Sequence, residues 1–115
     1  MRFAKWVFTG AGIWGLISVA PLYFLEGAVA RTSGPVTHPE YFYGFVGVTL
    51  AFQVLFLIVG RDPARLRPVM PACILEKATF GPAAWLLYLA GRTPGAVVVF
   101  ASIDMALGVL FVLAW

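Results

Sequence analysis

Four polar residues stand inside otherwise apolar stretches of this chain: Gln53, Glu76, Lys77 and Asp104. A charge in hydrocarbon is costly, and ionisable groups within a membrane commonly mark a site for a ligand, an ion or a proton. Glu76 and Asp104 are a carboxyl pair that could donate and accept a proton on one ligand. The same residues could instead form a closed polar clamp that fixes helix register. Both interpretations stay open at the level of sequence.

The four residues are predicted to lie at neighbouring depths. A helix rises about 1.5 Å per residue, so Gln53 and Glu76 lie roughly 10 Å from the inner end of their helices. Lys77 lies about 12 Å and Asp104 about 16 Å from that end, and Trp14 is about level with Lys77. Residues adjacent in sequence are about 100° apart on a helix, so Glu76 and Lys77 are not expected to pair simply with each other. We predict that Lys77 pairs with Asp104, and Glu76 with Gln53 or Trp14.

Small residues follow these charges at helical spacing. They are Ala101 and Gly108 around Asp104, Cys73, Gly81 and Ala84 around Lys77, and Gly10, Gly12 and Gly15 in the first segment. Small residues mark the faces on which membrane helices approach closely. The charges are therefore expected to face other helices and not lipid.

The elements that must position these residues are four apolar segments. Of the 115 residues, 62% are hydrophobic and 11% charged, whereas soluble domains average roughly 45–50% and about 25%. The segments cover about 3–25, 39–59, 69–90 and 95–115, each near the roughly 20 residues that cross a bilayer as a helix. The predicted fold is an all-α membrane protein: a single four-transmembrane-helix bundle over residues 1–115.

The basic residues predict the orientation of this bundle. Arg2 and Lys5 flank the first segment, and Arg61, Arg65 and Arg67 lie between the second and third, whereas the opposite side has Arg31 and Arg92. Positive residues are enriched on the cytoplasmic side, so both termini are predicted to face the cytoplasm. The net charge of +3 forms no basic patch of the kind that binds nucleic acid, so no nucleic-acid partner is expected.

A secretory signal peptide is the rival interpretation of the first segment. Arg2 and Lys5 precede an apolar run, and "EGAVA" (residues 26–30) ends in an A-x-A pattern. The run is longer than the about 7–15 apolar residues of a typical signal peptide. We therefore expect this segment to be retained as a helix.

A second polar group is predicted on the outer side. Its residues are Glu26, His38, Glu40, Tyr41 and Arg92. His38 could be a pH-responsive contact, although a lone histidine before a proline more often caps a helix or faces solvent. Thr37 and Glu40 have capping-box spacing. With one histidine and one cysteine, Cys73, in the chain, we expect no metal site, no cofactor and no intrachain disulfide.

Several motifs carry a resemblance to known proteins. "HPEYFYGF", "RDPARLRP", the "EK" of the third segment and the late "SIDMALGVLF" resemble small bacterial four-helix membrane proteins that are loosely DoxX-like. More distantly, the chain is similar to the sterol-isomerase and sigma-2-receptor group. The resemblance implies a multi-pass bundle in the bacterial cytoplasmic (inner) membrane and a cavity for lipophilic molecules. It implies no established activity, and no catalytic residue is carried over.

Three functions are consistent with these observations. The first is the binding of a small lipophilic ligand beside Gln53, Glu76, Lys77, Asp104 and Trp14, with acid–base isomerisation as a minor variant. The second is proton-coupled transport by a homo-oligomer, and the third is a structural or accessory subunit. Membrane lipids are the expected partners in all three. The sequence favours the ligand-binding function over an enzyme.

Overall fold

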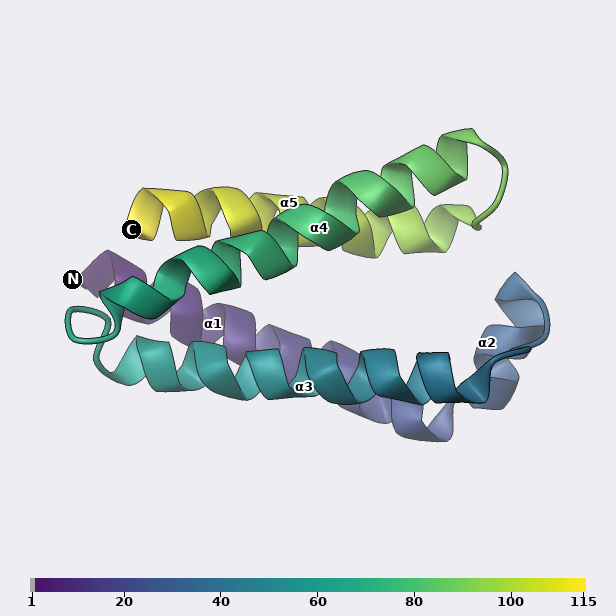
Figure 1. The fold of residues 1–115 in the computed structure, drawn as a ribbon, viewed down its shortest axis with the longest axis horizontal. Helices are drawn as coiled ribbons and strands as arrows, with labels where there is room; N and C mark the ends of the chain where they lie inside the picture. The colour runs from purple at the N-terminus through teal and green to yellow at the C-terminus, as the bar shows by residue number, and fades with distance from the viewer. Residues whose placement is uncertain (1) are drawn as a thin grey trace.

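The structure is a computed structural model that describes residues 2–115, and within that range it is helical with no strand. Its long helices are α1 (Arg2–Val19), α3 (Pro39–Arg61), α4 (Met70–Leu89) and α5 (Gly95–Ala114). The shorter elements are η1 (Ala20–Phe24), α2 (Glu26–Ser33) and η2 (Arg67–Val69). The predicted all-α class is confirmed, and each predicted apolar segment contains one long helix (Figure 1).

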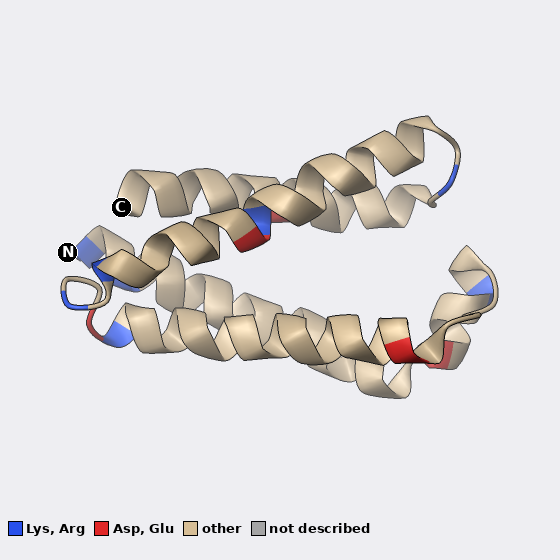
Figure 2. Cartoon of the chain, in the orientation of Figure 1, with Lys and Arg blue, Asp and Glu red and all other residues tan. Residues whose placement is uncertain are grey.

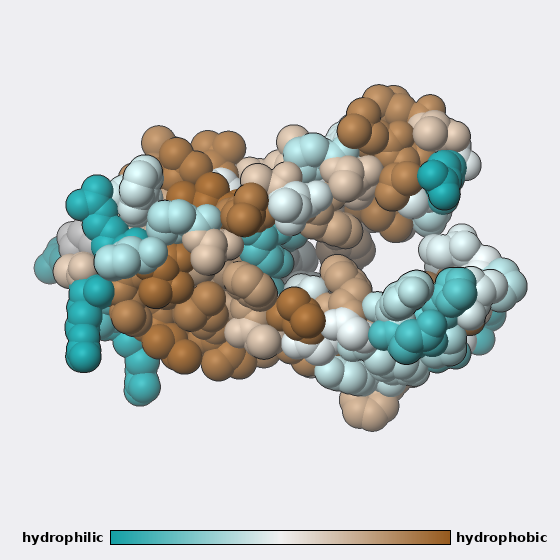
Figure 3. Space-filling model, in the orientation of Figure 1, coloured by the Kyte–Doolittle hydropathy of each residue, from teal (hydrophilic) through white to brown (hydrophobic). Residues whose placement is uncertain are grey.

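Three stretches are long and apolar enough to cross a membrane: Arg2–Phe24, Pro39–Arg61 and Gly95–Ala114. Helix α4 has 20 residues but is not among them, because Glu76, Lys77 and two prolines lower its hydropathy. Large apolar side chains cover much of the molecular surface (Figure 3). The composition and these long apolar helices are those of a multi-pass helical membrane protein.

The long helices form two antiparallel pairs, α1 with α3 and α4 with α5. The pairs meet at the end that holds both chain ends and the α3–α4 connection, which we call the terminal end (Figure 1). They diverge toward the opposite end, which holds α2 and the α4–α5 connection and which we call the α2 end. The space-filling view shows a hollow between the pairs at the α2 end (Figure 3). The charged residues at the terminal end include the basic residues of the α3–α4 connection (Figure 2).

Glycines allow the helices of each pair to approach closely. A Cβ atom added to Gly12 of α1 would lie 2.7 Å from Leu57 Cγ and 2.9 Å from the backbone oxygen of Gln53. A Cβ atom added to Gly108 of α5 would lie 3.1 Å from Lys77 Cβ. These contacts explain the small residues that the sequence places on the helix faces, because only small residues let two membrane helices come this close.

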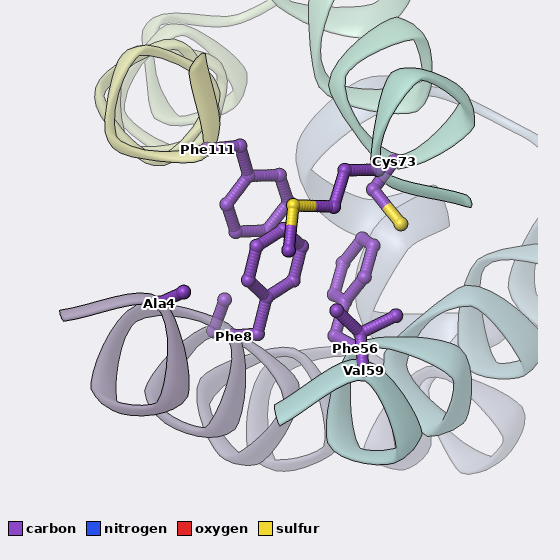
Figure 4. Packing of buried hydrophobic residues seen from close by; sticks show 8 residues of the cluster. Ala4, Phe8, Phe56, Val59, Cys73 and Phe111 are labelled. Atoms are coloured by element: carbon purple, nitrogen blue, oxygen red, sulfur yellow. The ribbon is translucent and has the colours of Figure 1, made fainter. Parts of the chain in front are cut away.

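An aromatic cluster joins the two pairs at the terminal end. The rings of Phe8 and Phe111 stack with centroids 4.2 Å apart, and the ring of Phe56 meets Phe111 edge-on at 5.0 Å. These three side chains come from α1, α5 and α3 and are fully buried with Met70 and Cys73 of α4 (Figure 4). All four long helices therefore share one core at this end.

The first α-helix ends earlier than the predicted segment, which extends to about residue 25. Residues 26–33 form the short helix α2. Glu26 in its first turn and Arg31 in its last turn have the charges that a helix dipole favours at those ends. Before it, the α-helix ends at Val19 and continues as the 3-10 helix η1, in which Pro21 cannot supply a backbone N–H.

The start of α3 also corrects a prediction. His38 is the N-cap residue and no side chain caps this helix end, so the capping box of Thr37 and Glu40 is not formed. Instead, Glu40 Oε1 lies 3.4 Å from Nδ1 of His38. The Glu40 carboxylate thus contacts the side chain of the N-cap residue.

Candidate functional site

A cavity lies between the two helix pairs. It has a volume of about 230 Å³, and side chains from all four long helices line it. The cavity exists because the pairs meet at the aromatic cluster and then diverge. The predicted residues Trp14, Gln53, Glu76, Lys77 and Asp104 all line it.

The ion pair between Lys77 and Asp104 is present as predicted. Nζ of Lys77 on α4 lies 3.1 Å from Oδ1 of Asp104 on α5 and donates a hydrogen bond to it. The lysine is only 3% exposed and also lies 5.1 Å from the ring centroid of Phe56. Both the anion and the aromatic face stabilise the buried ammonium group.

Glu76 does not pair as predicted. Its Oε2 lies 3.6 Å from Lys77 Nζ, so the two neighbours in sequence do contact each other. The long lysine side chain bridges the roughly 100° between their helix positions. Within residues 2–115, no hydrogen bond joins Glu76 to Gln53 or Trp14, and the buried Oε2 atom accepts no hydrogen bond. Glu76 is thus held near Lys77 by an ion-pair contact.

Gln53 is buried with half of its amide unsatisfied. Its Nε2 donates to the backbone oxygen of Thr49, one helical turn earlier, at 2.9 Å. Its Oε1 has no hydrogen-bond partner although the side chain is only 1% exposed. This oxygen lies against Gly15 of α1, where any Cβ atom would overlap it. A buried polar atom without a partner is uncommon in native proteins and requires an explanation.

The remaining walls of the cavity are mostly apolar. Several of the residues in these walls lie four or eight positions from a predicted site residue in the sequence. They are Phe45 and Thr49 before Gln53, Phe80 after Glu76, Phe100 before Asp104, and Ser18 after Trp14. Side chains four residues apart lie on the same helix face. Sequence reasoning did not name these lining residues, yet the four-residue spacing was a signal that could have found them.

The polar and apolar parts of the cavity are separated along its length. On α3 and α5 the chain runs from the α2 end toward the terminal end, so Phe45 and Phe100 lie nearer the α2 end than Gln53 and Asp104. On α4 the chain runs the other way, which again puts Phe80 nearer the α2 end than Glu76. The cavity therefore has a polar inner end above the aromatic cluster and aromatic walls toward the α2 end.

The predicted outer polar group is only partly assembled. His38 contacts Glu40 and its ring lies 5.1 Å from that of Tyr41, and His38 and Glu40 are both exposed. Glu26 belongs to α2, whereas Arg92 lies in the α4–α5 connection on the other helix pair. None of these residues lines the central cavity. In the described range 2–115, no three His, Cys, Asp or Glu residues form a group that could hold a metal ion.

Comparison with known proteins adds no family assignment. No protein-family model, curated protein or solved structure matches this chain. The functional argument therefore depends on the cavity and on the residues that line it.

Proposed function

We propose that α1, α3, α4 and α5 all cross the cytoplasmic membrane of a bacterium, with the terminal end at the cytoplasmic side. Hydropathy alone does not identify α4 as a membrane-spanning helix. Helix α4 packs antiparallel along α5 and is joined to it by a short connection, so a membrane that α5 crosses also surrounds α4. Its 20 residues extend about 30 Å, the thickness of a bilayer core. An even number of crossings also agrees with chain ends at the same end of the molecule (Figure 1).

Within this arrangement, we propose that the central cavity binds a small lipophilic molecule. The supporting observation is that a cavity with aromatic walls ends at Gln53, whose buried Oε1 has no hydrogen-bond partner among residues 2–115. Ligand sites are concave and mostly apolar, with a few placed polar groups that fix orientation. A polar layer that only held helices together would be expected to satisfy its own hydrogen bonds.

Native mass spectrometry of protein extracted from membranes in mild detergent tests this function. The matched variants are Val97→Trp, which fills the cavity from α5, and Val109→Trp, on the lipid-exposed face of the same helix. We expect a bound molecule on the wild-type protein and on Val109→Trp, and none on Val97→Trp. Equal retention by both variants, or no adduct on any of the three proteins, would contradict ligand binding in this cavity.

A further inference from the structure

Two buried acceptors at the inner end of the cavity indicate the chemistry of the molecule it would hold. We propose that this molecule carries a hydrogen-bond donor, a hydroxyl or an amine, at the end that enters first, and an apolar body behind it. The proposal rests on the proposed ligand-binding function and specifies the ligand class. Its basis is that Gln53 Oε1 and Glu76 Oε2 are both buried and accept no hydrogen bond, while both residues line the cavity.

Several donors around this inner end are already committed. Nζ of Lys77 donates to Asp104 and contacts the Glu76 carboxylate. Nε2 of Gln53 donates to the Thr49 carbonyl, and the Ser18 hydroxyl donates to the Trp14 carbonyl. A ligand that only accepts hydrogen bonds is left with the Trp14 indole N–H and the Thr49 hydroxyl, which also line the cavity. A donor instead meets the partnerless Gln53 Oε1 and the Glu76 carboxylate.

Charge at the inner end favours the same class. Two carboxylates, Glu76 and Asp104, face the single ammonium group of Lys77, and no other Lys or Arg of the described range lines the cavity. An anionic head group would therefore add a third negative charge beside one positive charge, which is repulsive in a medium of low dielectric constant. A neutral hydroxyl avoids this repulsion, and an ammonium group reverses its sign.

The direction of the ligand follows from the walls. Phe45, Phe80 and Phe100 lie toward the α2 end, beyond the polar residues. The polar end of a ligand matches the polar end of the cavity, and its apolar part matches the aromatic walls. Its donor is therefore directed toward Gln53 and Glu76, while its body lies among the aromatic rings. The hollow between the helix pairs at the α2 end lies on the side where the apolar body is expected (Figure 3).

A matched series of ten-carbon probes tests this class: 1-decanol, decylamine, methyl decyl ether, decanoate and decane. Each is added to purified full-length protein at a fixed ratio to detergent, and its apparent affinity is taken from the shift of the thermal unfolding midpoint. We expect decanol or decylamine to bind about tenfold more tightly than the ether, since the donor is the feature that the ether lacks. Decanoate is expected to bind more weakly than either donor.

Two cavity variants and one control locate the effect. Gln53→Leu and Glu76→Leu remove one acceptor each, and we expect each to reduce the ratio of decanol to ether affinity toward one. Thr79→Val is the control on α4, because Thr79 is exposed, lies outside the cavity and bonds only to the Glu76 backbone. The ratio is measured within each variant, so a general loss of stability cancels.

The outcomes separate this inference from the function beneath it. Equal affinity for decanol, decylamine, ether and decane would overturn the donor class while leaving lipophile binding intact. Tighter binding of decanoate than of either donor would overturn it too. If none of the probes shifts the midpoint, and no adduct is retained in native mass spectra, both the donor class and the proposed ligand-binding function are contradicted. A preference for the donors that survives in both leucine variants would show that Gln53 and Glu76 are not the acceptors.

Discussion

Nζ of Lys77 on α4 lies 3.1 Å from Oδ1 of Asp104 on α5, and this contact spans 27 residues of sequence. It joins the two helices of one pair, whereas Gln53 belongs to the other pair. The four polar residues that the sequence groups together therefore have different surroundings. Lys77 pairs with Asp104 and also contacts Glu76 Oε2, whereas Gln53 Oε1 is buried without a hydrogen-bond partner.

The ion pair makes the cost of losing one partner different from the cost of losing both. The cycle is run in a Glu76→Gln background, because Lys77 also contacts the Glu76 carboxylate. There Lys77→Met leaves Asp104 without its cation, and we expect a loss of about 3–5 kcal/mol in the free energy of unfolding. Lys77→Met combined with Asp104→Leu removes both remaining charges and should recover most of that loss. A double-mutant cycle on unfolding in mild detergent measures the coupling. Strictly additive effects of the two changes would contradict a stabilising pair.

The sequence predicted more of the helices than of the contacts between them. Hydropathy and length determine where an apolar helix forms, so the long helices follow the apolar segments. The pairing of Lys77 with Asp104 followed from depth, because a helix converts residue number into height. The depth of a residue does not determine which way its side chain points around the helix axis. The partner predicted for Glu76 was wrong because the flexible side chain of the adjacent Lys77 contacts it instead. The divergence of the helix pairs, which creates the cavity, depends on packing over the whole bundle.

Close packing of α1 on α3 predicts a sharp difference between two glycines of the same helix. Gly12→Ala would place a Cβ atom 2.9 Å from the backbone oxygen of Gln53, and a backbone atom cannot rotate away. We expect it to destabilise the protein by about 1–3 kcal/mol. Gly10→Ala meets no atom within 4 Å and should be neutral, or stabilising by up to about 1 kcal/mol through helix propensity. Thermal unfolding of the two variants measures this contrast, and equal midpoints would argue against the α1–α3 contact.

The aromatic cluster predicts that the terminal end carries much of the stability. Phe111→Ala removes the ring that stacks on Phe8 at 4.2 Å and leaves a cavity shared by three helices. Such changes cost about 3–5 kcal/mol in soluble cores, and we expect up to that amount here, since lipid replaces part of the transfer term but not the lost packing. Leu113→Ala, on the same helix but 68% exposed, is the control and should change the midpoint little. A larger effect at Leu113 than at Phe111 would place the core elsewhere.

Membrane crossing by α4 predicts a labelling pattern for cysteines placed at the two ends of the bundle. In a Cys73→Ala background, Thr32→Cys in α2 and Arg92→Cys in the α4–α5 connection should react with a membrane-impermeant maleimide on intact cells. Arg65→Cys, in the α3–α4 connection, should react only after the cells are permeabilised, because positive residues concentrate on the cytoplasmic side. If α4 did not cross, residues 65 and 92 would be labelled from the same side. That result would contradict the four crossings, and a reversal at all three positions would instead reverse the orientation.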